Sequence, residues 1–252
     1  MSKNAPFWPD GKMGAVSLTF DDALDTQLKN ALPLLDQARL AATFYVNPGR
    51  SSSWQNQLPE WQQAAQTGHE IGNHTERHPC SCNFGFDDCF CLEKLSLDDI
   101  AQTIDIAEDA LDSLFPSQQN ERSFCYPCYQ NYVGSGKTRQ SYVPIVAERF
   151  RGARGGGERA NDPLKIDLSY VWALDVQGKS GAQMINFVEE SVKQGQWAVL
   201  CMHGVGGQHL SIRTDALAEL VDFLASQRDS IWTDTFITIA DYTLHQRGVL
   251  KI

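Results

Sequence analysis

The stretch from Ala15 to Asp25 reads AVSLTFDDALD, and it joins a mostly apolar run to two adjacent carboxylates. Residues 15–20 are prone to form a β-strand. Asp21 and Asp22 follow at once and repel each other, and partial burial increases that repulsion. One explanation is that acidic residues favour the first turn of a following helix, although Asp25 could fill that role alone. The other explanation is that the carboxylates do chemistry where the strand ends.

The same alternation of a short apolar strand and an amphipathic helix recurs along the chain. Strands are predicted at residues 15–20, 42–46, 70–73, 123–126, 170–174, 198–202 and 235–239, and a loop in the Gly-rich segment 151–163. Helices are predicted at 25–38, 96–115, 181–195 and 214–227, the second capped by Ser96 or Asp98. This alternation implies parallel strands joined by crossover helices. Seven such units favour a barrel over an open sheet.

The composition is that of an ordinary globular protein with an acidic charge balance. No linker or internal repeat divides the 252 residues, so a single domain over residues 1–252 is predicted. The net charge of −10 makes nucleic acid and anionic membranes poor partners. The sequence shows no apolar run that could span a membrane and no signal core near its start. It therefore predicts a cytoplasmic protein, or a secreted or periplasmic one whose leader has been removed.

Side chains capable of acid–base or metal chemistry follow five of the predicted strands. They are Asp21 and Asp22, His74 and His78, the segment YPCY (126–129), Asp175, and His203. In α/β barrels the active site is built at the carboxyl ends of the strands. Each of these features is weak alone, but their shared placement predicts one site.

His74 and His78 are four residues apart, a spacing that can turn two imidazoles toward one cation. The alternative is a pair of histidines that hydrogen-bond within a polar loop. Asp22 favours the metal, because two imidazoles and one carboxylate leave room for water, as in hydrolytic zinc sites. Zinc lowers the pKa of such a water to about 7, and Asp21 could accept its proton.

His203 ends an apolar strand and could protonate a leaving group. A carboxylate beside it, such as Asp175, would favour the charged imidazole and suit it to act as a general acid. The alternative is a histidine that only hydrogen-bonds a backbone carbonyl.

The chain has seven cysteines, so at least one has no partner within it. The cluster HPCSCNFGFDDCFC holds Cys80, Cys82, Cys89 and Cys91, while Cys125 and Cys128 flank YP. The C-x-C pairs do not match the spacing of common zinc knuckles. An oxidising compartment would allow disulfides, and the sequence alone favours inert free thiols at least as much.

Taken in order, these segments resemble the motifs of the polysaccharide deacetylases, carbohydrate esterase family 4, also called the NodB homology domain. TFDD (19–22) resembles the first motif, and HTERH (74–78) the second, H-S/T-x2-H. RSFCYPCY (122–129) resembles the third, usually R-x-F-R-x-P-Y-G. WALD (172–175) and LCMHG (200–204) stand where the fourth and fifth lie. The match covers nearly the whole chain, and the first two motifs are specific in combination.

The resemblance implies a distorted (β/α)7 barrel and a role for each matched residue. It makes Asp21 the catalytic base and His203 the general acid. It makes Asp22, His74 and His78 the ligands of one divalent metal, usually Zn²⁺, with Co²⁺, Ni²⁺ or Mn²⁺ as alternatives. A backbone amide at Cys128 or Tyr129 would hold the oxyanion, with Tyr126 on the same substrate-binding segment.

The sequence departs from the family pattern around these residues. Ala23 and Leu24 replace the usual Gly-Pro after the aspartates, and the fourth motif lacks its Asp-Trp. Cys125 replaces the third-motif arginine that normally pairs with the base, and Arg154 is the candidate replacement. These departures affect the expected substrate pocket more than the metal centre.

A Cys-rich insertion at about 79–95 follows His78 directly. A Cys80–Cys128 disulfide at the rim of the site is one candidate, and Cys82 could pair with Cys91 or with Cys89. Several aromatic residues in predicted loops could stack on sugar rings, although most such residues pack locally: Trp54, Trp61, Phe84, Phe86 and Tyr132.

The leading hypothesis is a metal-dependent deacetylase that removes N- or O-acetyl groups from a saccharide such as chitin, peptidoglycan or acetylated xylan. An alternative on the same fold is hydrolysis of another linear amide, as in a deformylase or amidase. An alternative of another class is an inactive, carbohydrate-binding pseudoenzyme. A structural zinc protein would explain the cysteines but not the five strand ends.

Overall fold

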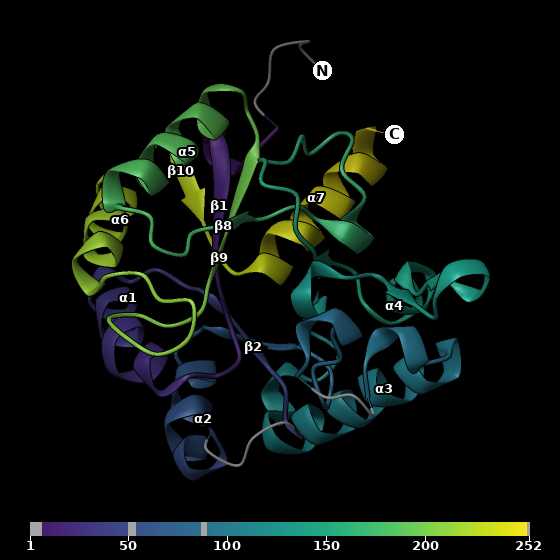
Figure 1. Cartoon of the computed structure of the whole chain (residues 1–252). Helices are drawn as coiled ribbons and strands as arrows, with labels where there is room; N and C mark the ends of the chain where they lie inside the picture. The colour runs from purple at the N-terminus through teal and green to yellow at the C-terminus, as the bar shows by residue number, and fades with distance from the viewer. Residues whose placement is uncertain (1–6, 50–53, 87–89, 251–252) are drawn as a thin grey trace.

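The computed structural model describes residues 7–49, 54–86 and 90–250, and one curled parallel β-sheet lies at its centre (Figure 1). In sheet order the strands are β7 (Ala153–Arg154), β4 (Phe124–Cys125), β3 (Glu70–Asn73), β2 (Thr43–Val46), β1 (Gly14–Asp21), β9 (Trp197–Met202) and β8 (Leu174–Asp175). β10 (Ile231–Thr233) also pairs with β1, near the start of that strand. A separate antiparallel pair consists of β5 (Tyr132–Val133) and β6 (Gln140–Ser141). The predicted α/β class with parallel strands is confirmed.

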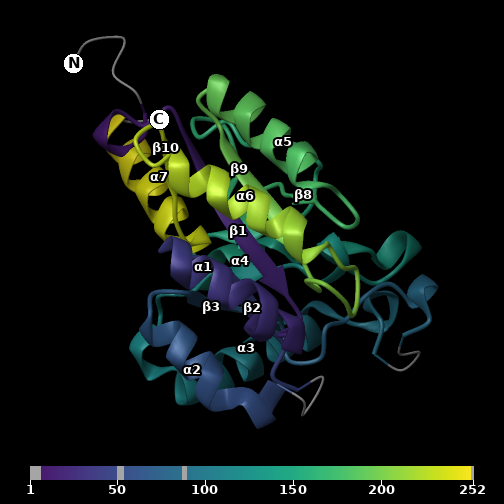
Figure 2. The same cartoon turned by 90° about the vertical axis from the view of Figure 1, so that its left-hand side faces the viewer.

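Helices surround this sheet (Figure 1). They are α1 (Leu32–Ala38), which follows a π-helical turn at Gln27–Ala31, α2 (Leu58–Gln66), α3 (Leu97–Leu114), α4 (Val143–Arg149), α5 (Gly181–Lys193), α6 (Thr214–Ser226) and α7 (Phe236–Leu250). Figure 2 shows α6, α1 and α2 on the side facing the viewer. Ser96 caps α3 through a capping box with Asp99, which decides between the two predicted caps.

The alternation of side chains along β1 separates an apolar face from a polar one. Leu18 and Phe20 are fully buried in the largest apolar cluster, together with residues from α1, α5 and α6. Ser17, Thr19 and Asp21 alternate with them and point to the other face. There Thr19 Oγ1 donates to the Leu200 carbonyl at 2.7 Å. The strand pleat therefore sends Asp21 into the inside of the curl.

The curl brings the two ends of the strand order together. A parallel bridge joins Arg154 to Val171, which lies just before β8. Val171 N donates to the Ala153 carbonyl at 2.8 Å, and Gly155 N donates to the Val171 carbonyl at 2.8 Å. The prediction of a plain loop over 151–163 is therefore wrong in part, because β7 lies within that segment.

Residues 235–239 are predicted as a strand, but α7 begins at Phe236 within that segment. Thr43 Oγ1 accepts from Phe236 N at 2.8 Å, and Glu70 Oε2 accepts from Ile237 N at 3.0 Å. These distant side chains satisfy the first amides of the helix, a contact that local sequence does not reveal. The strand lies just upstream, at β10. In place of the predicted strand at 170–174, Tyr170 ends a 3-10 turn, Val171 forms an isolated bridge, and the strand β8 covers Leu174–Asp175.

Within the described ranges, no helix has both the length and the apolar character needed to cross a bilayer.

Candidate active site

The carboxyl ends of four parallel strands bring the predicted polar side chains together. Asp21 is the last residue of β1 and Arg154 the last of β7, while His74 and His203 directly follow β3 and β9. The Nε2 atoms of His74 and His203 each lie 3.8 Å from Asp21 Oδ2. The guanidinium of Arg154 donates a hydrogen bond to the same oxygen. Asp21 is thus the centre of a cluster built from four strands.

Asp22 reaches this cluster because the backbone leaves the strand conformation at that residue. Continued as a strand, Asp22 would point to the apolar face, with Phe20. Instead, Asp22 has φ 73° and Ala23 has φ 47°, both in the left-handed region. Asn47 Nδ2 then donates to Asp22 Oδ1 at 3.1 Å. Ala23 takes the position where the family pattern has glycine, the residue that tolerates positive φ without cost.

Left-handed backbone recurs around the site. The non-glycine residues Asp22, Ala23, Thr75, His78, Cys128 and Tyr129 all have positive φ. Each such residue costs roughly 1–2 kcal/mol, so the surrounding contacts must hold it in place. One such contact is from Thr75 Oγ1, which accepts from His78 N at 3.0 Å. Strain concentrated in this way is typical of functional sites.

Asp22, His74 and His78 form a compact set of candidate metal ligands. One ligand atom from each lies within 4.8 Å of the others. Asp22 Oδ1 is 3.6 Å from His78 Nε2 and 4.0 Å from His74 Nε2. Two imidazoles and a carboxylate are a donor set that suits zinc and similar divalent cations.

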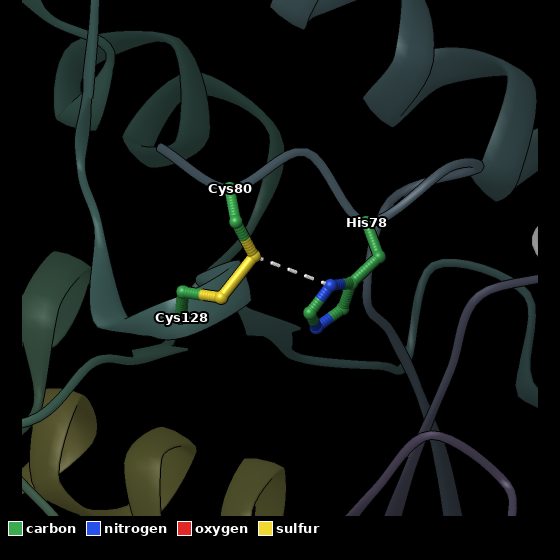
Figure 3. A group of neighbouring side chains, drawn as sticks. All are labelled: His78, Cys80 and Cys128. Carbon is green, nitrogen blue, oxygen red and sulfur yellow. Dashed lines mark hydrogen bonds between the residues drawn. A yellow bond between two sulfur atoms is a disulfide. The ribbon is translucent and has the colours of Figure 1, made fainter. Parts of the chain in front are cut away.

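Hydrogen bonds on the far side of each imidazole determine which nitrogen faces Asp22. His74 Nδ1 lies 2.9 Å from the Cys125 carbonyl, which can only accept, so Nδ1 carries the proton. His78 Nδ1 lies 3.4 Å from Cys80 Sγ, which belongs to a disulfide and has no hydrogen to donate (Figure 3). Both Nε2 atoms therefore present lone pairs toward a carboxylate, and His74 Nε2 is buried without a hydrogen-bond partner among the described residues.

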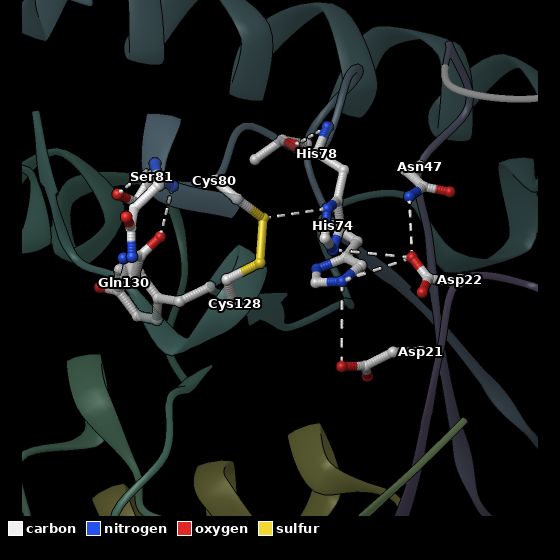
Figure 4. The surroundings of a disulfide bond; sticks show 12 residues. Asp21, Asp22, Asn47, His74, His78, Cys80, Ser81, Cys128 and Gln130 are labelled. Atoms are coloured by element: carbon white, nitrogen blue, oxygen red, sulfur yellow. Dashed lines mark hydrogen bonds and ion pairs between the residues drawn. A yellow bond between two sulfur atoms is a disulfide. The ribbon is translucent and has the colours of Figure 1, made fainter. Parts of the chain in front are cut away.

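Burial lowers the pKa of His74 and outweighs the opposite effect of Asp21 and Asp22. The lowered pKa favours the neutral imidazole, which is the form that binds metals. The residues therefore fit a divalent cation. Figure 4 shows Asp22, His74 and His78 turned toward one another, with Asp21 below them.

Asp21 remains ionised despite its burial. Burial raises its pKa, but the charge and hydrogen bond of Arg154, with smaller effects from the imidazoles of His74 and His203, lower the pKa well below the usual range. The thiols of Cys125 and Cys201 each lie 3.7 Å from Asp21 Oδ2 as donors, and burial raises the pKa of both thiols. Asp21 Oδ1 has no hydrogen-bond partner in the part of the chain that the structure describes. This carboxylate can accept a proton at Oδ1.

Arg154 takes the place of the missing third-motif arginine. Its side chain is fully buried, and its guanidinium lies 5.3 Å from the ring of Tyr45 and 5.5 Å from that of Tyr129. Cys125 occupies the family's arginine position on β4, and Arg154 lies directly opposite it on β7. In this chain the guanidinium that contacts Asp21 comes from β7, next to the strand that carries it in the family pattern.

His203 contacts Asp21 rather than Asp175. The carboxylate of Asp175 accepts from Gln177 N at 3.0 Å, and no hydrogen bond or ion pair joins it to His203 among the described residues. His203 Nδ1 is buried without a hydrogen-bond partner in the same described part of the chain. The expectation that Asp175 is the carboxylate beside His203 is therefore wrong, although both residues line one cavity.

The turn after β4 supplies the candidate oxyanion donor. Tyr129 N donates to the Tyr126 carbonyl at 3.1 Å, which leaves the Cys128 amide as the better candidate. The side chain of Tyr126 does not reach the substrate side, because it is buried in an apolar cluster and donates to the Ser169 carbonyl at 2.7 Å. The grouping of Tyr126 with the substrate residues is thus wrong.

Two disulfides flank the site. Cys80 bonds to Cys128, and Cys82 bonds to Cys91. Cys125 and Cys201 are buried free thiols. Cys89, the other candidate partner of Cys82, lies outside the described residues.

A cavity of about 340 Å³ opens over Asp21 and Asp22. Its wall also includes His78, Cys128, Tyr129, His203 and four residues that the motifs did not single out as site residues: Phe84, Phe86, His209 and Leu210. His209 follows the fifth-motif histidine by six residues in a glycine-rich loop, and only the folding of that loop places it here. Of the aromatic residues considered for sugar stacking, Trp54 and Trp61 are buried in the core.

The comparisons with known proteins identify the family and the fold. A model of the polysaccharide deacetylase family matches residues 9–135. No sequence among the curated proteins matches the chain.

Several solved structures share the fold. A Mycobacterium smegmatis protein assigned to the polysaccharide deacetylases is 19% identical with a TM-score of 0.67, and the match covers 95% of this chain and 93% of that one. A family 4 acetyl xylan esterase from Clostridium thermocellum, in complex with a cobalt ion, is 19% identical with a TM-score of 0.56, over 94% and 92% of the two chains. A mutant of a CE4 family pseudoenzyme with restored enzymatic activity is 20% identical with a TM-score of 0.58, over 92% and 69%. Since the family model spans half of the sequence, the chain belongs to the polysaccharide deacetylase family.

Proposed function

We propose that the chain is a metal-dependent hydrolase that removes acetyl groups from a saccharide. The observation that carries this proposal is the pairing of two features at one cavity. Asp22, His74 and His78 offer a neutral-imidazole and carboxylate ligand set, and Asp21 is a buried carboxylate held ionised beside it. A water molecule near both would meet a Lewis acid and a base together.

The roles of the residues follow from their places. A divalent cation, most simply Zn²⁺, bound by Asp22, His74 and His78 would polarise the acetyl carbonyl and acidify the attacking water. Asp21 accepts the proton of that water, and Arg154 keeps Asp21 ionised until it does. The Cys128 amide donates to the oxyanion. His203 donates a proton to the departing amine or alcohol.

The exposed aromatic pair beside the cavity supports a saccharide as the substrate. Phe84 and Phe86 stack with ring centroids 5.3 Å apart and are 52% and 59% exposed. They border the cavity that also contains Asp21 and His203. Exposed rings of this kind offer an apolar platform to the C–H face of a sugar. The acidic net charge of the chain suits neutral glycans better than polyanions.

The candidate substrates are chito-oligosaccharides, peptidoglycan and acetylated xylan. The acetyl xylan esterase among the structural neighbours makes an O-acetyl ester as reasonable a target as an N-acetyl amide. The two disulfides favour an oxidising compartment for the protein, hence a secreted or periplasmic location.

A site without the third-motif arginine would favour a deformylase or another amidase on the same fold. Arg154 supplies a guanidinium to Asp21 from β7, so the site does not favour the amidase alternative on this ground. A carbohydrate-binding pseudoenzyme is favoured by the existence of such neighbours, but in this chain the base, the three ligands and His203 are all present and close together.

Acetate release tests the proposal. The protein is stripped with a chelator and assayed on chito-oligosaccharides and acetylated xylan, before and after stoichiometric Zn²⁺. Release on at least one substrate, lost on stripping and restored by Zn²⁺, is the expected result. Undiminished release after complete stripping would exclude the metal mechanism. Saccharide binding without release on any substrate would favour the pseudoenzyme.

A further inference from the structure

The Cys80–Cys128 disulfide lies against a candidate metal ligand, and we propose that it positions that ligand. Specifically, the disulfide fixes the imidazole of His78 for binding a divalent cation, and its reduction by a thiol weakens that binding. The inference rests on the proposed metal-dependent function, because it concerns the same ligand set. It adds a redox-sensitive bond to that set.

The first step of the argument is the contact itself. Cys80 Sγ lies 3.4 Å from His78 Nδ1, while His78 Nε2 lies 3.6 Å from Asp22 Oδ1 (Figure 3). A disulfide sulfur can only accept, so the imidazole proton is held on Nδ1 and the lone pair on Nε2. A hydrogen bond to the non-ligating nitrogen is the usual way to fix a metal-binding histidine. A free thiol could instead donate to Nδ1 and favour the opposite tautomer.

The second step is the backbone that the disulfide joins. His78 has φ 52° and Cys128 has φ 51°, so both ends of the link lie near left-handed turns. The bond crosses from the loop after β3 to the turn after β4, which carries the candidate oxyanion amide. Ser81 N also donates to Gln130 Oε1 at 2.7 Å, so the same loops are joined a second time (Figure 4). We therefore expect loss of the disulfide to disturb the imidazole locally while the loops stay together.

The third step is access for a reductant. Cys80 is only 4% exposed, whereas Cys128 is half-buried and lines the cavity above Asp21. The thiolate of a small thiol attacks Cys128 Sγ, which forms a mixed disulfide and releases Cys80 as a thiolate that takes up a proton. A second thiolate attacks the reagent sulfur of the mixed disulfide and leaves Cys128 as a thiol. The reagent supplies two electrons and departs as its own disulfide.

The test measures metal affinity, which needs no turnover. Zn²⁺ is titrated in competition with a chromogenic chelator into the wild type, Cys80→Ala/Cys128→Ala and Cys80→Ser/Cys128→Ser. The control is Cys82→Ala/Cys91→Ala, which removes the other disulfide of the same loop. The Cys80→Ala/Cys128→Ala variant is expected to bind Zn²⁺ about 10–100-fold more weakly than the wild type. This is the usual loss of metal affinity when the hydrogen-bond partner of a metal ligand is removed. The serine pair should bind Zn²⁺ weakly as well, because a hydroxyl at position 80, like a free thiol, can donate to Nδ1 and favour the opposite tautomer.

Loading with Co²⁺ gives a second readout, since its visible spectrum reports ligand geometry. The spectrum should change for the alanine pair at 80 and 128 and not for the control. If the alanine pair fails to fold, Cys82→Ala/Cys91→Ala is reduced with dithiothreitol, freed of reagent under nitrogen and titrated in its place, so that Cys80–Cys128 is the only disulfide broken among the described residues. An unchanged Zn²⁺ affinity and Co²⁺ spectrum on loss of the Cys80–Cys128 bond would overturn the inference. An equal loss in the control would do the same.

The two proposals fail in different ways. If the protein releases acetate but its Zn²⁺ affinity does not change on loss of the Cys80–Cys128 bond, only this inference is wrong. A disulfide-dependent affinity with no acetate release on any substrate would remove only the proposed function.

Discussion

Replacing Arg154 with methionine should expose how Asp21 is held ionised in the core. Methionine keeps most of the apolar volume beside Tyr45 and Tyr129 and removes the guanidinium. Breaking a buried ion pair by removing one partner typically costs about 3–5 kcal/mol of unfolding free energy. Asp21 keeps two thiol donors and two nearby imidazoles, so the lower end, about 3 kcal/mol, is expected.

A double-mutant cycle in denaturant measures this directly, with chelator present so that no metal contributes. Asp21→Asn alone leaves Arg154 buried without its partner, and its Nε and Nη1 atoms already lack hydrogen-bond partners among the described residues. The pair Asp21→Asn/Arg154→Met should therefore lose less stability than the two single changes added together, by about 1–3 kcal/mol. Strict additivity would refute the account of Asp21 and Arg154 as one coupled pair.

The same substitution predicts a shift with pH. Burial raises the pKa of Asp21, and Arg154 is the largest of the effects that lower it. A carboxylate with a depressed folded pKa stabilises the protein above its unfolded pKa of about 3.9, and this contribution is lost as pH falls through the folded pKa. Without Arg154 that loss begins at higher pH. The acid limb of kcat/KM should move upward in Arg154→Met, and an unmoved limb would mean that Arg154 does not set the pKa of Asp21.

Three further substitutions have defined outcomes. His74→Ala should lower Zn²⁺ affinity in the chelator competition by at least about 100-fold, because a direct ligand matters more than an outer-sphere partner, and an unchanged affinity would place the metal elsewhere. His69→Gln should flatten the fall in unfolding free energy between pH 8 and 5. Burial lowers the pKa of His69 and outweighs the opposite effect of Asp36, so as pH falls the unfolded chain binds a proton at His69 before the folded chain does. The substitution should remove a slope of at most about 1.4 kcal/mol per pH unit, and parallel stability curves for the variant and the wild type would contradict this. Ser96→Ala should cost about 1 kcal/mol in denaturant unfolding by removing the capping box of α3, whereas Ser113→Ala, on an exposed position of that helix, should cost almost nothing; equal losses would argue against the cap.

The sequence predicts the parallel α/β fold and the strand ends well because both depend on local patterns. The apolar alternation that ends at Asp21 marks β1, and the apolar run before His203 marks the carboxyl end of β9. His74 follows the shorter strand β3, which is also predicted. The carboxyl ends of parallel strands lie at the same edge of a sheet. Residues that follow these strands can therefore be predicted to lie close together from the strand assignments alone.

Several of the failures of prediction involve contacts between distant segments. α7 begins where Thr43 and Glu70 accept its first amides, although residues 235–239 alone look like a strand. Asp175 ends a strand as predicted, yet its carboxylate accepts from Gln177 N and makes no hydrogen bond or ion pair with His203 in the described part of the chain. The place of His209 in the cavity wall depends on how a glycine-rich loop closes, which no periodicity encodes.

The separation of base from metal ligands is the most direct test of the account as a whole. Asp21→Asn and Asp22→Asn are compared with the wild type for Zn²⁺ content and for acetate release from the best saccharide substrate. Asp21→Asn should keep its Zn²⁺ and lose turnover by about 10²–10⁴-fold, the usual contribution of a general base. Asp22→Asn should lose Zn²⁺ and turnover together. A fully active Asp21→Asn, or an Asp22→Asn variant that keeps both metal and activity, would contradict the assignment of the two neighbouring carboxylates.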